Sequence, residues 1–295
     1  MGLGSIRNTP DGVDGEASQR WRARLVDLLE IGRASRVLVI GARTGKTAAL
    51  LCALLGDRRV DVAVPDGLTA GRVRDLLAGA DLYPYLIVGA EELGTNPRQY
   101  ARVVVPTASP DVDYRWIRAV EPGGKLLAAL SNPFGRVGLV RLTAGEHWAA
   151  GPFVACAEDS DLCRVRSRCS VFDFHADPYA AGVPEPVVLA EDLWKDLDAS
   201  FVAGLRLPGV GVTELEVDTR TFRWFFDATS WCRIEPDTDE VVSSGPRRLA
   251  QEIAGAYNWW VERGRPAYRE FGLTVAAFGT FAWYDSRTSG YLWAV

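Results

Sequence analysis

The chain has 295 residues, 48% of them hydrophobic, and a formal net charge of −5. This length and hydrophobic content allow one large domain or two, each with a buried core. The negative charge and the scattered basic residues argue against nucleic acid as a partner. No apolar run reaches the ~20 residues that span a bilayer, and residues 1–8 lack the apolar core of a signal peptide, so we expect a cytoplasmic protein without membrane contact.

The first half of the chain alternates between strand-type and helix-type patterns. Residues 1–16 are polar and have no period, which predicts disorder. Helices are expected at 18–30, 46–55, 69–78 and 114–117. Strands are expected at 36–40, 60–64, 85–88, 100–105, 121–130 and 138–142. These repeated strand–helix units predict an α/β domain over residues 17–174, with a mostly parallel sheet and helices on both faces.

The second half has another character. Residues 175–194 contain clustered Gly and Pro and are expected to form a linker, and residues 195–295 a smaller α+β domain. A helix is expected between Pro246 and Gly264, because apolar residues there share one helical face. Strand-type runs occur at 222–226, 240–242, 271–275 and 280–284, and the last two are expected to pair as a hairpin.

The cysteines give no sign of a disulfide framework or a metal site. The five are Cys52, Cys156, Cys163, Cys169 and Cys232, and no two of them form a C-x-x-C pair. Cys163, Cys169 and His175 match no common ligand spacing. We therefore expect reduced thiols and no metal.

A glycine loop follows the first expected strand. Its sequence from Gly41 to Thr47, G-A-R-T-G-K-T, is similar to a phosphate-binding loop but is one residue too short, and Ile40 stands where that loop needs glycine. The amides of such a loop must encircle a phosphate, so nucleoside triphosphate binding is not expected. A different nucleotide-like ligand near Arg43 and Lys46 is one alternative.

The same segment fits another pattern better. From Val37 to Leu51 the chain reads V-L-V-I-G-A-R-T-G-K-T-A-A-L-L, and Pro122-Gly123-Gly124-Lys125-Leu126 follows about eighty residues later. This resembles the Rossmann-like S-adenosylmethionine methyltransferases, particularly the protein-L-isoaspartate O-methyltransferase family, whose segment reads roughly V-L-E-I-G-T-G-T-G-Y-N-A-A-L-L. The resemblance covers about residues 18–153 and implies a Rossmann-like class I methyltransferase sheet.

Residues 195–286 resemble a narrower group. Their motifs are similar to the C-terminal extension of actinobacterial members that act on ribosomally made peptides. Those relatives methylate an Asp side chain of a peptide, and the ester then closes to an aspartimide. The motifs that carry the likeness are Gly245-Pro246-Arg247-Arg248-Leu249, Ala256-Tyr257-Asn258-Trp259-Trp260, Gly264-Arg265-Pro266 and Phe271-Gly272-Leu273-Thr274-Val275.

The cofactor positions that the resemblance implies are altered in this chain. The acidic residue before the glycine loop falls on Val39, and the middle glycine of the loop falls on Arg43. The carboxylate that would accept the ribose hydroxyls falls on Ala63, with Asp66 as a substitute. The Asp of the G-D-G element falls on Ala90, with Glu91 beside it. A vestigial cofactor site would comprise Gly41, Ala42, Arg43, Gly45, Asp66 and Glu91.

The substrate side also departs from the family. Its S-Q-P element is represented only by Ser18 and Gln19, so no catalytic residue is assigned. Trp259 and Trp260 are adjacent and cannot share one helical face, so one of them is expected at a surface that contacts a peptide or protein.

These observations predict a catalytically degenerate methyltransferase-fold protein. It would act as a peptide-binding or partner subunit in ribosomal peptide modification, without a cofactor. The alternative is an active enzyme that uses S-adenosylmethionine to O-methylate an Asp or isoAsp carboxylate of a peptide. The expected partner is a peptide precursor or a modifying enzyme, and the oligomeric state is left open.

Overall fold

The computed structural model describes residues 24–32, 35–41, 45–89, 93, 99–156, 180–217, 220–235 and 240–295. These residues divide into two compact units. Unit 1 contains the described parts of Met1–Leu130, Leu139–Val165 and Gly272–Thr280, and unit 2 contains those of Ser131–Gly138, Arg166–Phe271 and Phe281–Val295. Each unit therefore draws on separate stretches of chain, unlike the two consecutive domains suggested by the sequence.

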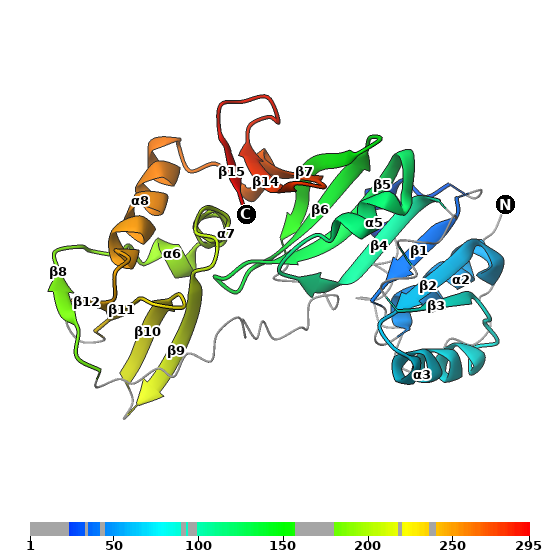
Figure 1. Ribbon diagram of the computed structural model, residues 1–295, viewed down its shortest axis with the longest axis horizontal. Coiled ribbons are helices and arrows are strands. Elements are labelled where there is room, and N and C mark those ends of the chain that lie inside the picture. Colours follow the sequence, from blue (N-terminus) through cyan, green and yellow to red (C-terminus); the bar gives the residue numbers. More distant parts are fainter. Residues whose placement is uncertain are drawn as a thin grey trace. The chain divides into compact units, whose positions relative to one another are not determined.

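Unit 1 is built on parallel strands. The first five strands are β1 (Val37–Ile40), β2 (Val60–Val64), β3 (Tyr85–Val88), β4 (Tyr100–Ser109) and β5 (Val120–Ser131). They lie in the order β3-β2-β1-β4-β5, with each neighbouring pair parallel, as Figure 1 shows for β1 to β4. Val39 is the Cα partner of both Val62 and Val104. The parallel α/β fold expected from the sequence is confirmed.

Helices cover this sheet and explain the apolar strands. α2 (Lys46–Leu55) packs against β1 and β2, and α3 (Gly67–Ala78) packs against β2 and β3. Every residue of β1 and β2 is buried, which is why both strands are almost uninterrupted apolar runs. A short helix, α5 (Tyr114–Arg118), precedes β5, and residues 24–29 are helical before β1.

The sheet continues beyond β5 with strands from distant parts of the sequence. They are β6 (Val137–Ala144), β7 (Trp148–Cys156), β13 (Phe271–Ala276), β14 (Gly279–Tyr284) and β15 (Leu292–Ala294). The full order is β15-β14-β13-β7-β6-β5-β4-β1-β2-β3. β13 pairs antiparallel with β7, and Leu273 is opposite Gly151. On the other side of β7, a Cβ at Gly151 would collide with the carbonyl of Arg141 on β6, so the approach of β6 to β7 at this point requires glycine. The sequence had placed the whole final hairpin in the second domain, whereas β13 extends the first sheet.

Unit 2 contains an antiparallel sheet of its own. Its strands are β8 (Val183–Glu185), β9 (Gly211–Val217), β10 (Arg220–Phe226), β11 (Trp231–Ile234) and β12 (Val241–Ser244), in the order β8-β12-β11-β10-β9. Its helices are α6 (Asp192–Lys195), α7 (Leu197–Arg206) and α8 (Leu249–Glu262). Phe225, Cys232 and Ile253 meet in its core. β8 lies within the expected linker, and α6 overlaps its end. Glu185 and Leu193 are buried, so this part of the chain is folded and does not form a simple linker.

The helix expected between Pro246 and Gly264 is α8, and it is shorter than expected at its start. Leu249, Ile253, Ala256 and Trp260 form its buried face. Gly245 has a φ of 104°, a conformation that favours glycine, so the chain still turns just before Pro246. The helix begins at Leu249 and ends before Gly264, whose φ is 78°.

Two of the thiols that the structure describes, those of Cys52 and Cys232, are free. Both are buried, and burial raises the pKa of Cys52 to about 12 and also raises that of Cys232. Cys163, Cys169 and His175 lie outside the described residues. In the part of the chain that is described, no cluster of potential metal ligands occurs, and no helix has the length and apolar character to cross a membrane.

Candidate functional site

The first candidate site lies where β1 ends and the glycine loop begins. In the order β3-β2-β1-β4-β5, β2 and β3 lie on one side of β1, and the chain then crosses to the other side of β1 to form β4 and β5. Ligands of open α/β sheets bind outside the carboxyl ends of the strands at such a reversal. Gly41 follows β1 at this edge, and Gly45 precedes α2. The geometry therefore puts the predicted glycines at the position where this fold binds ligands.

Both described glycines of the loop have backbone conformations that favour glycine. Gly41 has a φ of 72° and Gly45 a φ of 66°. A Cβ at Gly45 would also lie 3.1 Å from the Cδ2 atom of Leu76 on α3. The glycines thus serve the strand-to-helix turn itself, whatever binds beside it.

Hydrogen bonds fix Gly41 to its neighbouring strands. Its amide donates to the Ala63 carbonyl oxygen at 2.9 Å. Thr107 of β4 donates its hydroxyl to the Gly41 carbonyl oxygen at 2.7 Å. The sequence reasoning missed Thr107, and no sequence signal marks it, because it follows a Val-Val-Val-Pro run like any strand residue.

The carboxylates expected for a cofactor are replaced by apolar or structural groups at the positions that the structure describes. Val39 is fully buried in β1, and Ala63 is 3% exposed near the end of β2. Asp66 is the N-cap of α3, and its carboxylate accepts a hydrogen bond from the Thr69 amide at 2.7 Å. That hydrogen bond lowers the pKa of Asp66, so the group is ionised and engaged in capping.

The Pro122–Leu126 motif also has a structural explanation. Gly123 has a φ of 78°, and a Cβ at Gly124 would lie 2.8 Å from the Glu121 carbonyl oxygen. The register between β4 and β5 shifts at this point, which identifies a bulge. Lys125 forms an ion pair with Glu30 and thereby lowers the pKa of that carboxyl. The motif therefore shapes and anchors β5.

Comparison with known families finds a likeness for the first part of the chain. Residues 12–141 match the model of the family described as protein-L-isoaspartate(D-aspartate) O-methyltransferase (PCMT). This stretch is similar to the isoaspartate O-methyltransferase family. The resemblance seen in the glycine loop is confirmed, whereas the narrower likeness to peptide-modifying members stays a prediction.

Solved structures of methyltransferases are similar to this chain at low identity. One protein-L-isoaspartate O-methyltransferase is 12% identical, with 94% of this chain and 85% of that chain covered and a TM-score of 0.47. A putative protein-L-isoaspartate O-methyltransferase from Plasmodium falciparum, in complex with S-adenosyl-L-homocysteine, is 12% identical over 41% of this chain and 62% of that chain, with a TM-score of 0.34. A SAM-dependent methyltransferase from Thiobacillus denitrificans, also with S-adenosyl-L-homocysteine, is 16% identical over 37% and 47%, with a TM-score of 0.32. No curated protein matches.

Several residues that the isoaspartate O-methyltransferase resemblance singled out lie outside the described residues. These are Ser18, Gln19, Ala42, Arg43, Ala90 and Glu91. The structure describes Gly41, Gly45 and Asp66 at the carboxyl edge of the sheet, and their role toward a cofactor stays a prediction. The structure therefore describes the predicted cofactor positions on and after β1 and β2. The positions at the tip of the glycine loop stay predictions from the sequence.

The two adjacent tryptophans separate into a core residue and a surface residue. Trp260 is 2% exposed, and its indole nitrogen donates to the Pro266 carbonyl oxygen at 2.9 Å. Trp260 is therefore not part of a partner surface, and its inclusion in the predicted surface was wrong. Trp259 is half-buried and stacks with arginines, so it is the member of the pair that reaches the surface.

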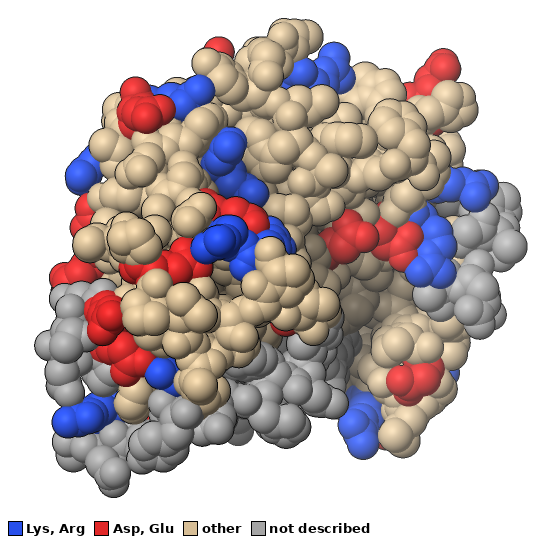
Figure 2. All heavy atoms as spheres, turned by 60° about the vertical axis from the view of Figure 1, so that its left-hand side comes forward, with Lys and Arg blue, Asp and Glu red and all other residues tan. Residues whose placement is uncertain are grey.

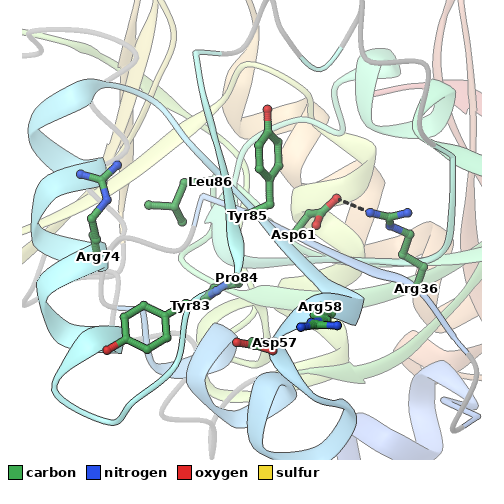
Figure 3. A pocket seen from close by; sticks show the side chains of 9 residues that line it. All are labelled: Arg36, Asp57, Arg58, Asp61, Arg74, Tyr83, Pro84, Tyr85 and Leu86. Carbon is green, nitrogen blue, oxygen red and sulfur yellow. Dashed lines mark hydrogen bonds and ion pairs between the residues drawn. The ribbon is translucent and has the colours of Figure 1, made fainter.

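A pocket of about 570 Å³ lies at the ends of the strands opposite to the glycine loop. Figure 3 shows the residues that line it, which are Arg36, Asp57, Arg58, Asp61, Arg74, Tyr83, Pro84, Tyr85 and Leu86. Arg36 precedes β1 and Tyr85 begins β3, so the pocket is at the amino ends of these strands. Asp61 is buried there and accepts hydrogen bonds from the Tyr100 hydroxyl at 2.7 Å and from Arg36 at 3.4 Å. This edge is opposite the one at which open α/β sheets bind ligands.

Charged residues of both signs are mixed on the face shown in Figure 2. Blue basic and red acidic side chains lie near one another among uncharged residues, and no broad basic area is visible among the residues described there. Phosphate-backbone recognition relies on clustered Lys and Arg. That nucleic acid is not a partner stays a prediction.

Proposed function

We propose that this protein is a peptide-binding member of its family that does not transfer a methyl group from S-adenosylmethionine and acts beside a partner. The observation that supports this most directly is the use of Asp66. The carboxylate closest in sequence to the end of β2 caps α3, and the β1 and β2 positions that would supply carboxylates are Val39 and Ala63.

The energetic consequence is large for a small cofactor. A hydrogen bond to a charged group is worth about 1.5–3 kcal/mol, so each missing carboxylate weakens binding roughly ten- to hundred-fold. The absence of two such anchors moves a micromolar ligand towards millimolar dissociation constants. Peptide binding does not depend on these positions, so it can persist after cofactor binding is lost.

Calorimetric titration with S-adenosylmethionine and S-adenosylhomocysteine tests the proposal. We expect dissociation constants in the millimolar range or no measurable heat. Micromolar binding of either compound would overturn it. Asp66→Asn is the matched control, because Asn caps a helix as well as Asp but removes the charge. If Asp66 were a ribose ligand, this variant would weaken whatever binding the native chain has.

An active peptide carboxyl O-methyltransferase is the second candidate. It is favoured by the turn at Gly41 and Gly45, which keeps its left-handed conformations beside the amino end of α2. In that reaction the peptide carboxylate would take the methyl group from the sulfonium. An aspartimide would then form when the next backbone nitrogen attacks the ester carbonyl and methanol leaves.

Mass spectrometry separates the two candidates. The full chain is incubated with S-adenosylmethionine and peptides that contain Asp or isoAsp. We expect no methyl ester and no dehydrated peptide. Either product, formed with the protein and not without it, would establish the second candidate and overturn the first.

A further inference from the structure

Two arginines of unit 2 stack on one tryptophan. Arg206 ends α7, Trp259 lies in α8, and Arg263 follows α8. The Cζ atoms of Arg206 and Arg263 each lie 4.1 Å from the centroid of the Trp259 ring. Arg206 also lies 5.1 Å from the Trp293 ring, and Arg263 4.6 Å from the Tyr291 ring. We call these five residues the Arg–Trp cluster.

Three aromatic rings contact Trp259 edge to face, two from the cluster and one from β14. Tyr284, Tyr291 and Trp293 meet Trp259 in T-shaped contacts, with centroid separations of 5.6, 6.1 and 6.1 Å. The Trp293 indole nitrogen donates to the Leu205 carbonyl oxygen at 2.7 Å, which ties this ring to the end of α7. Both guanidinium groups therefore lie over a ring that is itself fixed by its aromatic neighbours.

The charges of the cluster are not neutralised by the described residues. Other arginines of unit 2 form ion pairs, namely Arg223 with Glu214, Arg233 with Glu235, Arg247 with Asp227 and Glu252, and Arg265 with Asp192. Within the described part of the chain, no carboxylate lies within 4.0 Å of Arg206 or Arg263. The Nε atoms of both are buried without a hydrogen-bond partner among those residues.

The two guanidinium groups also disfavour one another. Burial lowers the pKa of Arg206, and the nearby charge of Arg263 lowers it further. Tyr284, which contacts Trp259, lies near two carboxylates. Its pKa is raised mainly by burial and also by the negative charges of Glu270 and Asp285. Glu270 accepts a hydrogen bond from the Ala267 amide. Uncompensated cations held close together are stabilised when an anion binds between or beside them.

We propose that the Arg–Trp cluster binds a carboxylate side chain of an acidic peptide. A guanidinium that stacks on a ring keeps its N–H donors in its own plane, where they match the two oxygens of a carboxylate. Tyr291 is 43% exposed and Trp259 is half-buried, so the cluster reaches the surface. Trp, Tyr and Arg are also the residues that dominate the energy of protein interfaces. This inference rests on the proposed peptide-binding function and names its surface and ligand chemistry.

Fluorescence anisotropy with the full chain tests the cluster. The probe is a labelled peptide of alternating Asp and Gly residues, and the comparison peptide has Asn in place of Asp. We expect the Asp peptide to bind at least roughly ten-fold more tightly, because each charged hydrogen bond contributes about that factor or more. The difference should shrink as salt is added. Equal binding of the two peptides, or no binding of the Asp peptide, would overturn the proposal.

Arginine variants locate the effect. Arg206→Gln and Arg263→Gln should each weaken binding of the Asp peptide by about ten- to hundred-fold. Arg263→Lys keeps the charge but loses the fork, so it should give an intermediate loss. Arg223→Gln is the matched control, because Arg223 also stacks 4.1 Å from a tryptophan, Trp194, but is paired with Glu214. Equal losses in Arg223→Gln and Arg263→Gln would contradict a site at the cluster.

Three further results separate this inference from a phosphate site and from the proposed function. Inorganic phosphate that competes more strongly than acetate would identify a phosphate site and overturn the carboxylate assignment. Binding of a neutral peptide as tight as the acidic one would overturn the cluster but leave the peptide-binding function. Micromolar S-adenosylmethionine binding would overturn the proposal that the protein does not use this cofactor, and would leave the Asp–Asn comparison intact. Thermal unfolding of every variant checks that Arg206→Gln remains folded, and Arg263→Gln carries the test if it does not.

Discussion

The glycine turn of unit 1 and the Arg–Trp cluster of unit 2 use their polar groups in opposite ways. At the turn, Thr107 bonds to the Gly41 carbonyl and Asp66 bonds to the Thr69 amide. In the cluster, Arg263 also donates to the Trp259 carbonyl oxygen at 3.3 Å, but both Arg206 and Arg263 stack on a tryptophan and have no carboxylate within ion-pair distance among the described residues. A polar group that holds backbone stabilises the fold, whereas an unneutralised charge at a half-exposed surface is available to a ligand. The comparison favours the cluster over the turn as the binding surface.

The largest expected effect separates the two tryptophans of α8. Trp260→Ala should lower the free energy of unfolding by about 3–5 kcal/mol, because a large core side chain is removed and the hydrogen bond to Pro266 is lost. Trp259→Ala should cost less stability, since Trp259 is half-buried, but should abolish binding of the Asp peptide. Urea unfolding and the anisotropy assay measure the two effects.

The control for the tryptophan pair is the folded fraction. Binding is compared at temperatures at which both variants are fully native. If Trp260→Ala then lost peptide binding as completely as Trp259→Ala, the cluster would not be the distinct surface that we infer. If Trp259→Ala were the more destabilising change, its ring would be acting as core.

A smaller effect tests whether the glycine turn is structural. Gly41→Ala and Gly45→Ala should each lower the free energy of unfolding by about 1–3 kcal/mol, because a side chain is unfavourable at these positive φ angles. Gly45→Ala should be the worse of the two, since its Cβ would approach Leu76. Chemical denaturation gives these values.

Gly71→Ala is the matched control for the turn. Gly71 lies inside α3, and a Cβ there meets nothing within 4 Å. This variant should raise the free energy of unfolding by about 0.4–1 kcal/mol, through helix propensity and a less flexible unfolded chain. Equal behaviour of all three alanine variants would mean that the turn does not depend on glycine.

The sequence predicted the elements that are determined locally. Strands at 60–64 and 85–88 have the bounds that were expected, because short runs of strand-forming apolar residues between turn residues have a clear pattern. The pairing of β13 with β7 was not predictable, since a strand pattern shows one strand and not its partner. α7 was not expected because its residues follow a Gly- and Pro-rich stretch that suggested a linker.

The candidate surfaces show the same limit. The glycine turn is contiguous in sequence, so its position was expected. The Arg–Trp cluster joins residues from α7, α8 and the last strand, and only Trp259 was singled out beforehand. Arg206 carries no signal of its own in the sequence. Its role follows from stacking and from the lack of a described carboxylate beside it, and both are properties of the folded chain.

The smallest expected effect concerns Asp66. It tests whether this carboxylate, which follows β2, serves as the cap of α3. Its pKa is lowered in the folded state by the Thr69 amide. A carboxyl whose folded pKa is lowered stabilises the protein at pH values above its unfolded pKa, and this contribution is lost as the pH falls through the folded pKa. Asp66→Ala should therefore be slightly less stable than the native chain at neutral pH and converge with it in acid. Asp66→Asn should keep the cap and follow the native chain more closely at neutral pH. Urea unfolding at a series of pH values measures these free energies. A constant difference between the native chain and Asp66→Ala at all pH values would show that the ionised carboxylate is not the cap. Asp66 would then be available to a ligand.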